Sequence, residues 1–114
     1  MSFDPSLDPR VRRADWASDQ AALRAIRARV FVEEQGVPVA LEWDGWDPRA
    51  RHLLATAPDG LAVGTARVLP DGQIGRMAVL PQWRRHGLGS ALLRAALTLA
   101  LGPGRPLPFV HAQT

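Results

Sequence analysis

The sequence predicts an α+β fold, a mixed α/β layered domain built on a mostly antiparallel sheet. Two amphipathic stretches are long enough to be helices, and short apolar runs between them are separated by Asp-Gly pairs, which favour hairpins. A final strand–helix–strand step predicts a right-handed parallel crossover between the fourth and fifth strands. The length of 114 residues suits one small domain, and 46% hydrophobic residues indicate a folded core.

The N-terminal third is expected to contain a lead-in, a strand and a long helix. Residues 1–10 are interrupted by prolines and predict a flexible lead-in, so the domain is expected over 11–114. The run 11–15 predicts a short strand. Residues 19–35 carry Leu23, Ile26 and Val30 at helical spacing, which predicts one amphipathic helix. Ser18 or Asp19 is expected to cap this helix, and Gly36 with Pro38 to end it.

The remaining two thirds alternate between turns and regular elements. Residues 37–50 are expected to be irregular, since prolines and glycines interrupt them. Three antiparallel strands follow, then a helix with an apolar leucine and alanine stripe, then a mostly apolar run of the kind found in buried parallel strands. The expected bounds are 51–57, 61–69 and 74–80 for the strands, about 89–101 for the helix and 107–113 for the last strand.

Composition excludes several function classes. The pI of about 11.2 reflects an absence of lysine, tyrosine and cysteine rather than a basic patch, because the arginines are scattered among acidic residues. We therefore expect no nucleic-acid partner. Without cysteine there is no disulfide and no thiolate zinc site, which suits the cytoplasm, and no His, Asp and Glu cluster has metal-ligand spacing. No apolar run approaches the roughly 18 residues of a membrane helix, so no membrane partner is expected.

The run "RRHGLG" at residues 84–89 carries the clearest chemical signal. It lies between a predicted strand and a predicted helix, and its glycines permit close backbone approach. The free N–H groups of a helix start, two arginines and the Ser90 hydroxyl together make a site for a phosphate. An ordinary tight turn with solvated arginines is the alternative. The spacing matches neither a Walker loop nor a dinucleotide fingerprint.

In its context, Arg84-x-x-Gly87-x-Gly89 after "GRMAVLPQW" resembles the acetyl-CoA motif of the GNAT N-acetyltransferases. The runs "RARVFVEEQGVP" and "EWDGWDPRARHLLA" are similar, in order, to the ElaA-like and YjcF-like subgroup. The resemblance implies the GNAT fold and acetyl transfer from acetyl-CoA to a small-molecule or peptide amine, without a metal. It also implies that backbone groups of the fourth strand bind pantetheine and that the following loop binds the pyrophosphate. The residues carried over are Met77, Ala78, Val79, Arg84, Arg85, His86, Gly87, Leu88, Gly89 and Ser90.

Three residues are candidates for catalysis. The resemblance places Glu33 and Glu34, at the end of the first helix, where family members bind the acceptor amine, and either carboxylate is a candidate base. His52, at the start of a strand, is the third candidate. For all three a structural or solvated role is the alternative. His111 and the acidic Asp44 and Asp47 are expected near the acceptor, while the tryptophans are expected to pack or to line its pocket.

The chain departs from the family pattern at its end. GNAT domains continue with a further helix and two strands, and that segment often carries a tyrosine that protonates the leaving thiolate. The sequence contains no tyrosine, so we expect a domain shortened at its C-terminus with no assigned general acid. An open fifth-strand edge favours pairing with another chain, including a homodimer. The alternative function is a non-catalytic module that binds CoA or is completed by another subunit.

Overall fold

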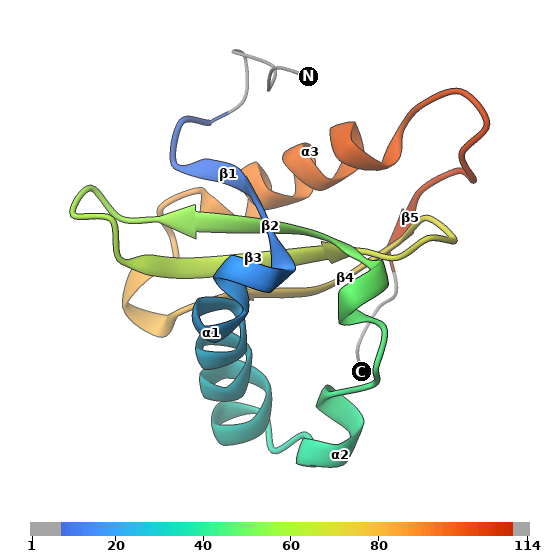
Figure 1. Ribbon diagram of the computed structural model, residues 1–114. Coiled ribbons are helices and arrows are strands. Elements are labelled where there is room, and N and C mark those ends of the chain that lie inside the picture. Colours follow the sequence, from blue (N-terminus) through green and yellow to red (C-terminus); the bar gives the residue numbers. More distant parts are fainter. Residues whose placement is uncertain (1–7, 111–114) are drawn as a thin grey trace.

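The computed structural model describes residues 8–110 of the chain (Figure 1). Its five strands form one sheet in the order β1-β2-β3-β4-β5, antiparallel throughout except for the parallel pair β4–β5. The strands are β1 Val11–Ala14, β2 Arg51–Thr56, β3 Ala62–Val68, β4 Gln73–Val79 and β5 Phe109–Val110. The helices are α1 Trp16–Arg27, η1 Ala28–Glu34, α2 Val39–Glu42, η2 Asp47–Arg49, η3 Pro81–Trp83 and α3 Leu88–Ala100. This order confirms the predicted fold class and the crossover from β4 through α3 to β5.

Helices cover both faces of the sheet, so the core has two parts. On one face α3 buries Leu88, Leu92 and Ala95 against inward side chains of the strands. On the other face α1 and η1 bury Leu23, Ile26 and several neighbours against Leu54 and Ala78. The alternation of strand side chains between the two faces therefore leaves the central strands β2 and β3 buried almost throughout.

The first helical segment starts earlier than predicted and changes its helix type, while its end lies within one residue of the prediction. Neither Ser18 nor Asp19 caps it; Asp15 does, because its extended backbone lets its carboxylate accept from the Ser18 N–H at 3.2 Å. The helix consequently begins at Trp16. From Ala28 the backbone widens into the π-helix η1, which ends where Gly36 adopts a φ of 73°. Wide turns of this kind are uncommon and occur often at functional sites.

The remaining strands and α3 lie within one or two residues of their predicted bounds. The last strand is the exception, because β5 pairs with β4 only at Phe109 and Val110 in the described part of the chain. Both side chains are exposed, so the expectation of a buried strand is wrong for these two residues. Residues 111–113 of that expected strand, including His111, lie outside the described residues, as do residues 1–7 of the expected lead-in.

The segment between η1 and β2 is held to the sheet by buried charges. Arg27 donates to Glu42 and to Asp47, each at 2.7 Å, and Arg67 donates to Asp47 at 3.2 Å. Arg67 also pairs with Asp44 at 2.9 Å. We call this cluster the ionic core; its members are Arg27, Glu42, Asp44, Asp47, Arg67 and Arg76.

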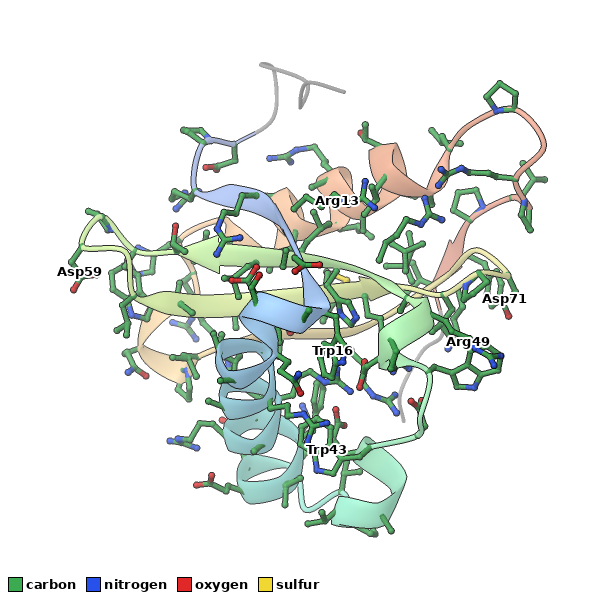
Figure 2. All side chains as sticks on the ribbon, viewed as in Figure 1. Arg13, Trp16, Trp43, Arg49, Asp59 and Asp71 are labelled. Atoms are coloured by element: carbon green, nitrogen blue, oxygen red, sulfur yellow. The ribbon has the colours of Figure 1, made fainter. Side chains whose placement is uncertain are left out.

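Two tryptophans lie where α1 faces segment 37–50 (Figure 2). Trp16, the first residue of α1, stacks on His52, and Trp43 lies over the ionic core. The Arg27 guanidinium lies 4.9 Å from the Trp43 ring centre, a cation–π contact that the burial of Arg27 strengthens. Asp44 and Asp47 are therefore engaged in structural pairs, and Trp43 has the packing role expected for it.

Candidate cofactor site

The predicted phosphate loop lies between the end of β4 and the start of α3, as the sequence indicates. The chain leaves β4, makes the short turn η3, and enters α3 through Gly87. A cavity of about 400 Å³ opens at this point. Its lining combines apolar, cationic and backbone groups from Val79, Trp83, Arg84, Arg85, Gly87, Leu88, Gly89 and Ser90. Six of the seven residues expected to hold the pyrophosphate line this cavity; His86 does not.

The backbone of the loop exposes its N–H groups. Gly87 has φ 76° and ψ 8°, a left-handed conformation that glycine adopts without strain, and no side chain caps the helix that follows. Arg85 also has a positive φ of 66°, which is uncommon outside glycine and occurs at ligand sites. A Cβ at Gly89 would meet nothing within 4 Å, so the space in front of the helix start is open. These features suit an oxyanion or phosphate at the positive end of α3.

Arg84 does not extend freely into this cavity. Its Nη1 donates to the Glu34 carboxylate at 2.9 Å, and its Nη2 donates to the second oxygen of the same carboxylate. Its Nε donates to the Val79 carbonyl at 2.9 Å. Arg84 therefore connects the end of η1, the end of β4 and the start of the loop. Arg85, the neighbouring arginine, is exposed and also lines the cavity.

A β-bulge shapes β4 before it reaches the loop. Arg76 and Met77 together oppose the single residue Ala66 of β3, and the register shifts there. Arg76 has a φ of 47°, which L residues rarely adopt, and its carbonyl accepts from the Thr65 hydroxyl at 3.0 Å. The bulge therefore separates the first half of β4, which pairs with β5, from its last residues.

The last residue of β4 directs its backbone toward the edge of the sheet, which no strand among the described residues 8–110 covers at this point. Leu80 donates its N–H to Val63, so this pair occupies a hydrogen-bonded position of the antiparallel ladder. The adjacent pair, Gly64 and Val79, is then non-hydrogen-bonded, and the N–H and carbonyl of Val79 point away from β3. Ala78 is buried against α1, whereas Met77 and Val79 pack at the edge of the α3 core. Of the three predicted pantetheine contacts, Val79 has the clearest outward geometry.

The two glutamates at the end of η1 have different surroundings. The hydrogen bonds from Arg84 hold the Glu34 carboxylate and lower its pKa. Glu33 is exposed, and within residues 8–110 it forms no ion pair. The structure thus brings Glu34 to the loop and leaves Glu33 open to solvent on the same segment.

His52 is removed from the loop and enclosed. It is 2% exposed, its ring stacks on Trp16 at 5.0 Å, and its Nε2 lies 2.9 Å from the Asp47 carbonyl. Burial lowers the pKa of His52, and the Asp47 carbonyl opposes that shift. This placement favours the structural alternative for His52, and we propose no catalytic role for it.

His86 is an exposed residue of the loop. Its ring lies 5.9 Å from that of Trp83, and its carbonyl accepts from Arg10 at 2.9 Å. Arg10 in turn pairs with Asp8 and lowers the pKa of that carboxyl to about 2. Sequence reasoning missed Arg10 as a support of the loop, because contacts across 76 residues leave no local pattern.

Two further findings concern the described residues alone. No group of three or more His, Cys, Asp or Glu side chains in this part of the chain could hold a metal ion. None of the helices between residues 8 and 110 combines the length and apolar character that crossing a bilayer requires. The expectations that no metal and no membrane take part stay predictions.

Residues 13–106 match the Acetyltransferase (GNAT) family. A Bacillus subtilis (strain 168) protein that carries the provisional name of acetyltransferase is 37% identical over 95 residues, which cover 78% of this chain. The chain spans 64% of the length of that relative. The crystal structure of Escherichia coli ElaA is similar with a TM-score of 0.71 and 28% identity, over 85% of this chain and 74% of ElaA.

A third similarity concerns the fold alone. The structure of a Clostridium acetobutylicum protein named a predicted acetyltransferase, solved with acetyl-CoA, has a TM-score of 0.69 at 18% identity. The alignment covers 90% of this chain and 79% of that protein. At this identity the likeness establishes that the two chains share an architecture.

Proposed function

Because this chain belongs to the GNAT acetyltransferase family, we propose that it transfers an acetyl group from acetyl-CoA to a primary amine. The observation that carries the proposal is the cavity at the start of α3, where an uncapped helix, two glycines and Arg85 meet the outward-facing end of β4. The Clostridium structure with the same architecture contains acetyl-CoA, which supports this choice of acetyl donor.

The groups available fit the parts of acetyl-CoA in order along the chain. The N–H groups at the start of α3, the Ser90 hydroxyl and Arg85 suit the pyrophosphate. The outward backbone groups of Val79 suit an amide of pantetheine, which binds an exposed strand edge as another strand would. The thioester would then lie near the end of η1, where the two glutamates are.

The reaction forms a C–N bond and breaks a C–S bond. The neutral amine attacks the thioester carbonyl carbon, the nitrogen loses a proton, and the CoA thiolate leaves and takes up a proton. We assign the Val79 N–H to the carbonyl oxygen as negative charge develops there, because it points to the open edge. We assign Glu33 to the amine proton through water, since Glu34 is occupied by Arg84.

A thiol-release assay tests the proposal. Purified protein is mixed with acetyl-CoA and a panel of small amines, amino acids and peptide N-termini, and free CoA thiol is measured over time. Thiol release that depends on both the protein and an amine is expected, with Glu33→Gln reducing the rate about tenfold or more, as loss of a general base does. Release that no amine accelerates would contradict transfer.

The second candidate is a protein that binds CoA without catalysis. The observation that favours it is the lining of the α3 cavity, which among the described residues includes no tyrosine, histidine or carboxyl group that could protonate the leaving thiolate. Acetyl-CoA binding by calorimetry without thiol release under any of the acceptors would favour this module. Assays at several protein concentrations, with sedimentation, test the predicted homodimer.

A further inference from the structure

One guanidinium connects three elements that the reaction would use. Arg84 uses Nη1 and Nη2 on the two oxygens of Glu34, and Nε on the carbonyl of Val79. A planar guanidinium with a fixed fork is suited to this kind of bidentate contact, and the ammonium of a lysine is not. The end of η1, the end of β4 and the start of the loop are therefore held in one arrangement by a single side chain.

Arg84 binds the carbonyl of Val79, and the N–H of the same residue is the group assigned to the acyl oxygen in the proposed reaction. Val79 directs both of its backbone groups away from β3, toward the open edge. Its carbonyl is satisfied by Arg84 at 2.9 Å, so its N–H is the group that remains for a substrate. The carbonyl belongs to the peptide unit that follows Val79, and the N–H to the unit before it, where Ala78 pairs with Thr65. Fixing the carbonyl therefore restrains the end of β4 at Val79, the residue that carries the N–H.

The ion pair is suited to holding this geometry. The Glu34 and Arg84 side chains are 31% and 42% exposed, so water screens their attraction and the pair adds little to stability. The hydrogen bonds from Arg84 lower the pKa of Glu34, as a pairing that favours the charged carboxylate does. Glu34 does not line the cofactor cavity, whereas Arg84 does. A pair of small stabilising value that joins two elements at a binding cavity is explained better by positioning than by stability.

We propose that Glu34 and Arg84 form a strap that holds the end of β4 at Val79 in position for acetyl transfer. In this assignment both are positioning residues: Glu34 is not the base and Arg84 is not primarily a phosphate ligand. The inference rests on the proposed function, because the Val79 N–H has a role only if an acyl oxygen lies against it. It predicts that losing the strap slows the chemical step while acetyl-CoA still binds.

The kinetic experiment uses Glu34→Gln and Arg84→Lys with the thiol-release assay and a calorimetric titration of acetyl-CoA. Glu34→Gln is expected to lower kcat about tenfold to a hundredfold, as small misplacements of a reacting group do, with acetyl-CoA affinity within about threefold of the parent. The kcat of the double variant is expected to fall no further than that of the worse single variant, because each change removes the same Glu34–Arg84 pair. Glu34→Asp is expected to restore part of the lost kcat.

A matched control removes a carboxylate elsewhere. Asp59 lies at the tip of the turn between β2 and β3 (Figure 2), where its side chain accepts from the Leu61 N–H at 3.0 Å. Asp59→Asn retains that acceptor and is expected to leave kcat unchanged. An active parent whose kcat survives Glu34→Gln would overturn the strap. So would a Glu34→Gln variant that loses acetyl-CoA affinity and keeps kcat, since Glu34 would then only orient a phosphate ligand.

A second readout does not depend on activity. Amide NMR spectra of the free protein are expected to show the Val79 and Leu80 resonances shifted in Glu34→Gln and in Arg84→Lys, and unshifted in Asp59→Asn. A parent that neither binds nor transfers would refute the proposed function, and these spectra would still decide whether the strap holds Val79. Unshifted Val79 and Leu80 resonances in both variants would refute the strap itself.

Discussion

The arginines on the α1 face of the sheet and those at the start of α3 differ in burial and in pairing. On the α1 face Arg27 is 1% exposed and its guanidinium is shared between Glu42 and Asp47 under the Trp43 ring. At the start of α3 the side chain of Arg84 is 42% exposed, and Arg85 is exposed beside it. A buried charge must be fully paired to be tolerated, whereas an exposed one is available to a ligand. The difference separates Arg27, which maintains the fold, from Arg85, which lines the cavity and is proposed to bind a ligand. Arg84 is held by Glu34 and Val79.

The two long helices show the same difference at their N-termini. The carboxylate of Asp15 caps α1, so its free N–H groups and its positive end are satisfied by the chain itself. No side chain caps α3, which begins at Gly87 and faces an open cavity. This contrast between the two helix starts supports the proposal that an anion binds at the start of α3.

The largest expected effect tests whether the ionic core is structural. Arg27→Met leaves Glu42 and Asp47 as buried carboxylates without their main partner, so we expect the free energy of unfolding to fall by about 3–5 kcal/mol. Urea denaturation followed by circular dichroism measures it. Arg13→Ala, on the exposed side of β1, is the control and is expected to change stability by less than about 0.5 kcal/mol. A fall of less than about 1 kcal/mol in the free energy of unfolding for Arg27→Met would contradict the structural role assigned to the buried arginine.

The next effect concerns pH and His52. Burial lowers the pKa of His52 below its usual 6.5, against the opposing Asp47 carbonyl. Below pH 6.5 His52 is therefore protonated to a greater extent in the unfolded chain than in the folded chain. The stability contributed by neutral His52 is complete above that pH and is lost as the pH falls, by up to about 1.4 kcal/mol per pH unit.

His52→Gln is expected to remove this slope between about pH 5 and 6.5, where the unfolded residue titrates. Urea midpoints measured across that range in parent and variant provide the comparison. The same slope in both proteins would show that another group near the ionic core is responsible.

A smaller effect tests the closed start of α1. Asp15→Ala removes the acceptor for the Ser18 N–H, and loss of such a cap costs about 1 kcal/mol. Thermal unfolding is expected to show the loss, while acetyl-CoA binding should be unchanged because the cap is remote from the α3 cavity. Asp15→Asn, which keeps an acceptor, is expected to retain most of the stability.

The smallest effect on stability is expected at the loop. Arg85→Ala removes an exposed side chain, so the free energy of unfolding should change by less than about 0.5 kcal/mol. Acetyl-CoA affinity should nevertheless fall, because a charge that faces the pyrophosphate is lost. An Arg85→Ala variant that is less stable than the parent and binds acetyl-CoA equally well would contradict a binding role for Arg85 and indicate a structural one.

Local patterns in the sequence predicted most of this molecule. Hydrophobic spacing and Asp-Gly turns located β2, β3, β4 and α3 within two residues, and the glycine spacing located the loop. These features depend on neighbours along the chain. The wrong cap of α1 has a local cause as well: Asp15 follows a strand directly, and the helix pattern becomes apolar only at Leu23, so the start was placed too late.

The contacts that the sequence did not reveal are distant ones. Arg84 and Glu34 are 50 residues apart, and Arg27 and Asp47 are 20 apart. Charged residues are usually solvated, so no pattern marks which of 14 arginines are buried. His52 is a catalytic candidate in the sequence alone, and its enclosure beside Asp47 depends on the fold of segment 37–50, which no local pattern shows.

Calorimetric titration of acetyl-CoA into the parent protein and into Gly89→Asp tests the assignment of the α3 start most directly. A Cβ at Gly89 meets nothing in the protein, so the variant should fold with an unchanged Tm while its carboxylate occupies the space meant for phosphate. The account predicts one bound acetyl-CoA per parent chain and an affinity at least about tenfold lower in the variant, or about 1.4 kcal/mol. No binding by the parent, or equal binding by both proteins, would contradict it.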